Sequence, residues 1–156
     1  MGNFITACSA IFPRHIFDEV GSLDESLKGV DDYDLWLRIA LKYGIIGISE
    51  PLCGWRQSKN SFSADKSKQY IEVEKIFDKL GDKTEKIKVG HGKNMIRIIT
   101  TSLLAKKYDI VSEYSKKIHR YPVSFKARII IWISRLSHKF GRFFVIILQK
   151  LGMVNL

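Results

Sequence analysis

The sequence predicts an α/β chain, in which a partial sheet-plus-helix region is followed by a helical extension. Three observations predict this class. Residues 4–12 and 45–48 are rich in β-branched or aromatic residues, as strands are. Residues 31–43, between these two segments, have apolar positions at helical spacing. From Asp65 onward apolar residues recur at helical spacing almost to the C-terminus, so a helical extension is expected there.

The N-terminal helices have recognisable boundaries. Pro13 suits the first turn of a short helix over residues 13–20, because its missing N–H is not needed there, and Gly21 ends that helix. The second helix begins with the acids of residues 31–34, which the positive end of the helix dipole stabilises as anions. We expect Gly44 to end this helix in a left-handed conformation. The remaining expected elements are strands over residues 45–48 and 52–56 and a loop over residues 57–64.

The C-terminal half is expected to be helical throughout. Gly81-Asp82 and Tyr121-Pro122 break the apolar periodicity and separate the helices. Gly141 is the expected bend of the last helix. The expected helices cover residues 66–80, 84–107, 109–119 and 124–151.

Composition excludes several classes of protein. The two cysteines, Cys8 and Cys53, are too few for a disulfide framework or a cysteine metal site, and we expect buried, reduced thiols. The four histidines are scattered without ligand spacing and are interpreted as structural or surface residues. Neither a signal pattern nor an apolar run of about 20 residues occurs. We therefore expect a cytoplasmic chain, in solution or at the inner face of the membrane.

Two neighbouring segments carry a motif that points to chemistry. The first, residues 30–38, reads Val-Asp-Asp-Tyr-Asp-Leu-Trp-Leu-Arg, and the second, residues 17–25, reads Phe-Asp-Glu-Val-Gly-Ser-Leu-Asp-Glu. Together they resemble the acceptor-side segment of family 2 glycosyltransferases, which have the GT-A fold. Leu23 and Asp31 stand where that family usually has Phe and Glu. The resemblance covers about residues 4–63, so residues 1–63 are expected to be the C-terminal part of a catalytic domain and residues 64–156 its extension.

The resemblance implies roles for single residues. It places the general base of an inverting sugar transfer at Asp32, which would take the proton of the acceptor hydroxyl. It also implies that Asp31, Trp36 and Arg56 contact the acceptor or the diphosphate. Helical spacing agrees, since Asp32 and Trp36 are four residues apart and share a helix face. The same spacing predicts an ion pair between Asp34 and Arg38.

The same resemblance implies partners outside this sequence. Such enzymes bind a nucleotide-sugar donor, a glycan acceptor and Mg²⁺ or Mn²⁺, the metal being held by an Asp-x-Asp motif in a nucleotide-binding half. No such half or metal motif precedes residue 4. We therefore expect a split or truncated chain that is inactive alone and that pairs with a donor-half chain. Residues 54–63 resemble a further segment of this family, in which Arg56 matches an arginine and Ser58 stands where many relatives have histidine. The sequence does not reveal the donor sugar, the acceptor or the linkage.

The basic C-terminal segment indicates a second kind of partner. The net charge is +10, and no Asp or Glu follows Glu113. In residues 126–151 an apolar stripe accompanies Arg128, Arg135 and Arg142, which are each seven residues apart. This pattern is typical of a helix lying on an anionic membrane surface. A helix packed on the chain's own core is the alternative.

Two further functions stay open at this point. One is a non-catalytic protein that binds a membrane, a glycan or a partner subunit. The other is nucleic-acid binding, which is the weaker alternative because the aromatic residues of the basic segment lie on the apolar stripe and not among the charges.

Overall fold

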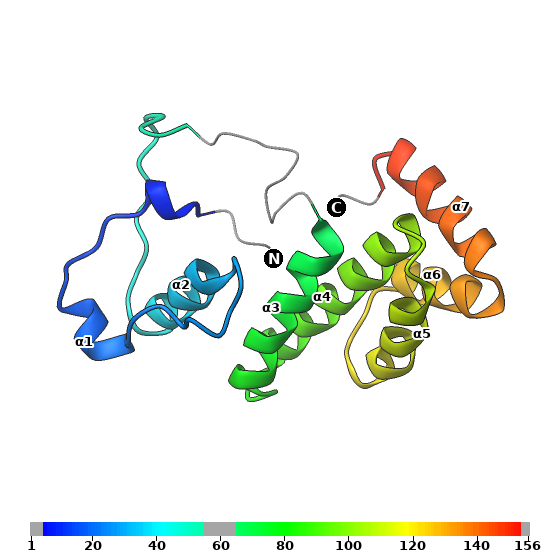
Figure 1. The fold of residues 1–156 in the computed structure, drawn as a ribbon, viewed down its shortest axis with the longest axis horizontal. Helices are drawn as coiled ribbons and strands as arrows, with labels where there is room; N and C mark the ends of the chain where they lie inside the picture. The colour runs from blue at the N-terminus through cyan, green and yellow to red at the C-terminus, as the bar shows by residue number, and fades with distance from the viewer. Residues whose placement is uncertain (1–4, 55–64, 154–156) are drawn as a thin grey trace. The chain divides into compact units, whose positions relative to one another are not determined.

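The computed structural model describes residues 5–54 and 65–153, and every regular element in these two ranges is a helix (Figure 1). The prediction of an α/β fold with a partial GT-A-like sheet is therefore wrong for the described residues, since they contain no strand. The elements are η1 (Ala7–Ser9), α1 (Ile16–Val20), α2 (Asp31–Lys42), α3 (Lys66–Leu80), α4 (Glu85–Leu104), α5 (Tyr108–Lys117), η3 (Ile118–Arg120), α6 (Phe125–Leu136) and α7 (His138–Lys150).

The chain divides into two compact units. The N-terminal unit spans Gly2–Ala64, and the C-terminal unit spans Asp65–Leu156.

The N-terminal unit is organised by the contact between α1 and α2. Ile16 on α1 packs against the buried face of α2, which consists of Leu35, Trp36 and Ile39. Phe12 closes this small core with an edge contact to Trp36, the ring centroids lying 5.6 Å apart.

The strands expected over residues 4–12, 45–48 and 52–56 do not form among the described residues, because no neighbouring strand is present there to pair with them. A lone extended segment leaves its backbone N–H and C=O groups unpaired, so it is stable only beside another strand. In residues 5–12 the chain instead forms the short helix η1, with extended backbone at Thr6 and Ala10. Residues 45–48 carry exposed isoleucines, Ile46 being 92% exposed. Residue 4 and residues 55–56 of the expected strands lie outside the described ranges.

The C-terminal unit is a helical assembly built around α4. This helix packs against α3, α5 and α7, and α6 packs against α7 (Figure 1). Its fully buried side chains Ile98, Ile99 and Leu103 form the centre of the core. The core is completed by side chains from the following elements: Val111, Tyr114, Ile118, Ile130, Ile131, Val145 and Leu148.

Local signals set several helix ends. Asp65, Thr84 and Ser124 each precede a helix, and each side chain accepts a hydrogen bond from a backbone N–H of the first turn. The predicted helix over residues 66–80 is confirmed without change. Gly44 does not adopt a left-handed conformation, so its prediction as a cap is wrong; α2 ends at Lys42 with Tyr43 as its C-cap.

The last expected helix is in fact two helices. The chain breaks at Ser137, which has extended backbone, and α6 and α7 pack against each other. Gly141 lies where the two helices approach each other closely, because a Cβ atom there would be 2.8 Å from the Cα of Ser134. The glycine expected to bend one helix therefore allows two helices to pack together.

Candidate functional sites

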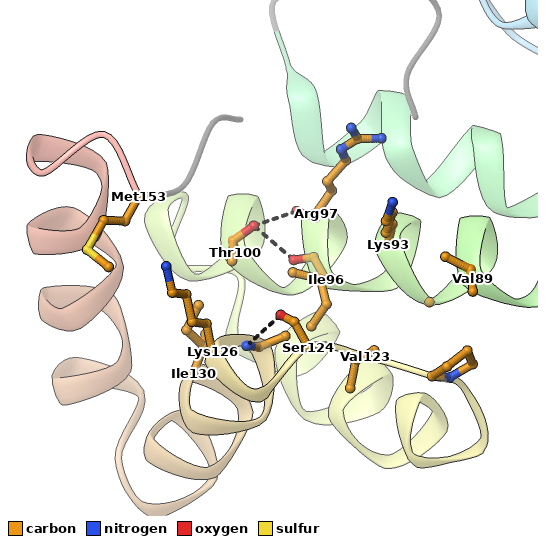
Figure 2. Close-up of a pocket in the computed structure, with 13 residues that line it drawn as sticks. Val89, Lys93, Ile96, Arg97, Thr100, Val123, Ser124, Lys126, Ile130 and Met153 are labelled. Atoms are coloured by element: carbon orange, nitrogen blue, oxygen red, sulfur yellow. Dashed lines mark hydrogen bonds between the residues drawn. The ribbon is translucent and has the colours of Figure 1, made fainter.

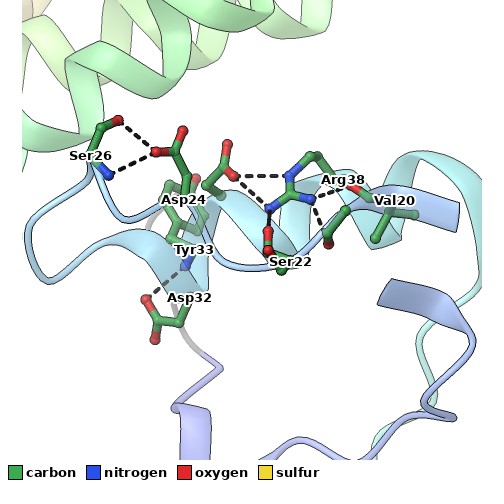
Figure 3. A network of polar contacts seen from close by, with 9 residues as sticks. Val20, Ser22, Asp24, Ser26, Asp32, Tyr33 and Arg38 are labelled. Carbon is green, nitrogen blue, oxygen red and sulfur yellow. Dashed lines mark hydrogen bonds and ion pairs between the residues drawn. The ribbon is translucent and has the colours of Figure 1, made fainter. Parts of the chain in front are cut away.

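The two carboxylates singled out from the sequence lie in the first turn of α2. Asp31 and Asp32 are both half-buried, and the Oδ1 of Asp32 accepts a hydrogen bond from the backbone N–H of Tyr33 at 2.7 Å (Figure 3). Asp31, with Glu25, lines an open hollow of about 420 Å³, whereas Asp32 is not among its lining residues. Of these two neighbouring acids, therefore, only Asp31 lines a concave surface.

Trp36 belongs to the core of the N-terminal unit. Its side chain is 9% exposed and packs between Phe12 and Ile16 of the same cluster. A sugar-binding platform needs an accessible ring face, so the described conformation gives Trp36 a packing role. Arg56, the fourth predicted site residue, lies outside the described residues.

Arg38 explains much of the motif that suggested sugar transfer. Its guanidinium pairs with Asp34 at 2.9 Å, which confirms the predicted ion pair. It also donates hydrogen bonds to three backbone carbonyl oxygens at the end of α1, those of Val20, Gly21 and Ser22 (Figure 3). Gly21 has φ +83°, and a Cβ there would lie 3.3 Å from the guanidinium. The conspicuous glycine, acid and arginine therefore form a clamp that joins α1 to α2.

A second candidate site is the surface of α6 and α7. On α6, exposed Phe125, Trp132 and Leu136 lie beside exposed Arg128 and Arg135. Trp132 is 64% exposed, although an indole of this size is normally covered.

On α7 the exposed face is apolar with basic edges. Phe140 and Phe143 are 69% and 63% exposed, and Ile147 follows on the same face. Lys139 and Lys150 are exposed beside them. We call the exposed residues of both helices, with Leu151 at the end of α7, the basic hairpin surface: Phe125, Lys126, Arg128, Trp132, Arg135, Leu136, Lys139, Phe140, Phe143, Ile147, Lys150 and Leu151.

Arg142 does not belong to this surface. It lies on α7, is half-buried, and its Nε is buried without a hydrogen-bond partner among the described residues. The prediction that Arg128, Arg135 and Arg142 share one side is therefore wrong, because the break at Ser137 puts them on different helices.

A cavity of about 450 Å³ lies within the C-terminal unit (Figure 2). Its lining is mainly apolar and comes from α4, the segment before α6, and α6 itself. Three basic side chains, Lys93, Arg97 and Lys126, line it, and no acidic residue does. The guanidinium of Arg97 also lies over the ring of Tyr70, 5.6 Å from its centroid. The cavity combines an apolar interior with a positive charge.

A third cluster, which sequence reasoning missed, lies between α3 and α4. His91 Nε2 is 2.8 Å from Glu74 Oε1, and His91 Nδ1 is 3.5 Å from Asp82 Oδ1. Burial lowers the pKa of His91, but the hydrogen bonds and charges of Glu74 and Asp82 outweigh burial and raise it. Asp78, one turn after Glu74, completes the cluster. The four-residue spacing of Glu74 and Asp78 was visible in the sequence, whereas the approach of His91 depends on how two helices pack.

The cysteines are exposed, so the prediction of buried thiols is wrong. Both sulfur atoms lie near the hydroxyl of Thr6, at 3.5 Å for Cys8 and 4.0 Å for Cys53.

Among the described helices, none combines the length and apolar character that crossing a bilayer requires. The chain matches no family model, and no curated protein or solved structure is significantly similar to it. Membership of glycosyltransferase family 2, inferred above from residues 17–38, is therefore withdrawn. The pattern is explained instead by the clamp between α1 and α2, in a unit whose described residues form no sheet.

Proposed function

We propose that this chain binds the surface of an anionic membrane through the basic hairpin surface of α6 and α7. The observation that carries the proposal is an exposed aromatic and aliphatic surface bordered by cations, in a segment without any acid after Glu113. Exposed apolar patches of this kind mark contact sites, and the charge selects an anionic partner. The lipid leaflet that faces the cytoplasm carries such a charge.

The magnitudes favour a reversible surface contact. A large apolar side chain contributes about 1.5–3 kcal/mol when it is fully removed from water. Each basic residue near anionic lipid adds on the order of 1 kcal/mol. Several aromatic residues together with Arg128, Arg135, Lys139 and Lys150 therefore suffice for binding without a transmembrane segment.

The cavity beside α6 is consistent with this partner. An apolar interior lined also by Lys93, Arg97 and Lys126 fits a phosphate headgroup and the first part of its acyl chain. Lys126 lies in the first turn of α6, so the cavity and the basic hairpin surface share one helix.

Sedimentation with liposomes tests the proposal. Wild type should pellet with vesicles containing phosphatidylserine or phosphatidylglycerol, and should stay in the supernatant with pure phosphatidylcholine. Replacing Phe140 and Phe143 by Ser should abolish pelleting, whereas Leu41→Ser, an equally exposed leucine on α2, should leave it unchanged. Equal pelleting of all three proteins would refute the proposal.

Tryptophan fluorescence gives an independent readout. Trp132 should shift to shorter wavelength when anionic vesicles are added, because its exposed ring enters the interface. The measurement uses a Trp55→Phe background, because the chain has a third tryptophan at residue 55. In that background Trp132→Phe should remove the shift, since Trp36 is already buried. A shift that persists in Trp132→Phe would place the lipid contact elsewhere in the chain.

A second candidate function is sugar transfer from a nucleotide sugar, with Asp32 as base. The observation in its favour is the hollow lined by Asp31 and Glu25, since carboxylates at a concave surface suit hydroxyl-rich ligands; Asp32 is the neighbour of Asp31 in the chain but does not itself line this hollow. It rests on these acids alone and not on a family assignment. Arg56 as a diphosphate contact and Mg²⁺ or Mn²⁺ as cofactor are parts of the same proposal.

The test is turnover of nucleotide sugars with Mg²⁺ or Mn²⁺, by the chain alone and co-expressed with the product of the neighbouring upstream reading frame. Transfer that Asp32→Asn abolishes would support a base at this position. Transfer at an unchanged rate in Asp32→Asn, or none in either preparation, would remove this candidate.

A further inference from the structure

The cluster between α3 and α4 has the composition of a metal centre. Glu74 and Asp78 are one turn apart on α3, and His91 reaches them from α4. One ligand atom from each of these residues lies within 4.8 Å of the others. An imidazole with two carboxylates is a donor set used by Zn²⁺ and related divalent ions.

The distances require little rearrangement. Four ligands at about 2.0–2.2 Å from a tetrahedral zinc ion lie about 3.4 Å from one another. Glu74 Oε1 and His91 Nε2 are 2.8 Å apart, so they would separate by a fraction of an ångström to admit an ion. Asp78 is exposed, so its carboxylate is free to turn toward the ion and water has access to a fourth position.

Neighbouring side chains hold two of the three ligands in place by hydrogen bonds, as is usual in metalloproteins. Ligating histidines usually donate their other ring N–H to a carboxylate, and Asp82 Oδ1 faces His91 Nδ1 at 3.5 Å. Ligating carboxylates are usually hydrogen-bonded in turn, and Asn94 Nδ2 donates to Glu74 Oε2 at 2.8 Å. The ring of Phe77 stacks on His91 with an interplanar angle of 8°, which fixes the imidazole plane.

A buried polar atom beside the cluster supplies an independent observation. Asn94 is 2% exposed and its Nδ2 donates to Glu74, while its Oδ1 has no hydrogen-bond partner among the described residues. A buried acceptor without a donor is costly, and a positive charge nearby offsets part of that cost. Glu74 itself is 8% exposed, and a buried carboxylate also needs a cation.

We propose that Glu74, Asp78 and His91 bind one divalent transition-metal ion, with Zn²⁺ as the best fit. The ion joins α3 to α4 inside the C-terminal unit and takes the place of the proton between Glu74 and His91. This site is separate from the acids of α2 and from the basic hairpin surface. If these residues bind no metal ion, the proposal that the chain binds a membrane is unaffected.

The test separates a metal centre from a network of hydrogen bonds. Asp78→Asn removes one ligand, while no hydrogen bond of Asp78 is among those that join Glu74, His91 and Asp82. Asp109→Asn on α5 is the matched control, because it makes the same chemical change in the same unit away from the cluster. All proteins carry Cys8→Ser and Cys53→Ser and lack a histidine tag, so thiols and tags do not compete for the metal.

Calorimetric titration with Zn²⁺ should give one ion per chain for the parent protein and for Asp109→Asn. Asp78→Asn should bind about 100-fold more weakly or worse, because losing a mere hydrogen-bond partner of a metal ligand already costs about 10–100-fold. Co²⁺ should produce a visible absorption band in the parent protein and not in Asp78→Asn. At a Zn²⁺ concentration that saturates the parent protein, its melting temperature should rise clearly more than that of Asp78→Asn.

Two results would overturn the proposal. One is the absence of stoichiometric Zn²⁺ binding by the parent protein, which would make His91 a hydrogen-bonded core residue. The other is equal Zn²⁺ affinity in Asp78→Asn and Asp109→Asn, which would show adventitious binding to surface acids. Circular dichroism of both variants without metal establishes that each is folded.

Discussion

Asp65 should make the stability of the C-terminal unit depend on acid pH. It caps α3 by accepting a hydrogen bond from Lys68 N, and its carboxylate pairs with Lys107 Nζ at 2.9 Å. Burial raises the pKa of Asp65, but the bonds from Lys107, Ser67 and Lys68 outweigh burial and lower it from 3.8 to about 2. Folding therefore favours the charged, deprotonated form of the Asp65 carboxyl group.

The magnitude follows from that difference in pKa. A difference of nearly two pH units corresponds to about 2.4 kcal/mol at 1.36 kcal/mol per unit. The side chain of Asp65 is 38% exposed, so solvent screening reduces the contribution to about 1 kcal/mol. Because the folded pKa is the lower one, this stability is fully present above pH 3.8. It is lost as the pH falls through about 2.

Urea denaturation of wild type and Asp65→Asn across pH 7 to pH 2 measures the effect. Asparagine keeps the cap and removes the charge, so the two proteins should differ by about 1 kcal/mol at pH 7 and converge near pH 2. Glu113→Gln, which breaks an exposed pair with Lys117, is the control and should show a smaller pH dependence. A difference between wild type and Asp65→Asn that stays constant with pH would refute the reasoning.

Three further perturbations test the packing of the two units. Gly141→Ala should destabilise the C-terminal unit by about 1–3 kcal/mol in thermal unfolding, because the Cβ of the alanine would lie 2.8 Å from Ser134. An unchanged melting temperature would show that α6 and α7 are not in close contact. Arg38→Lys should lower the free energy of unfolding of the N-terminal unit by about 2 kcal/mol, since lysine cannot reproduce the bonds to Asp34 and three carbonyl oxygens. An unchanged near-UV circular dichroism spectrum, to which the buried Trp36 contributes, would contradict this. Deleting residues 126–156 should abolish cooperative unfolding of the C-terminal unit, because α6 and α7 supply part of its core; a cooperative transition in the truncated chain would disprove it.

The candidate sites show the limits of sequence motifs. The ion pair of Asp34 and Arg38 follows from four-residue spacing, and it is present. A catalytic role for the whole motif does not follow from this spacing, because spacing does not show which other residues a side chain contacts. Arg38 binds carbonyl oxygens 16–18 residues away, and Trp36 lies in the core. These contacts exist only in the folded unit.

Helix positions were determined largely by the sequence. Capping side chains at Asp65, Thr84 and Ser124 act on the nearest turn, so their effect can be read from neighbouring residues. The basic, acid-free character of the segment after Glu113 is likewise a property of composition.

Tertiary structure decided the features that depend on residues distant in sequence. Residues 45–48 have the apolar composition of a strand. The described residues contain no neighbouring strand with which this segment could form backbone hydrogen bonds, so its strand propensity is not realised. The division of the last helix and the role of Gly141 depend on α6 packing against α7. The approach of His91 to Glu74 spans 17 residues and requires two helices to pack face to face, which no local spacing encodes.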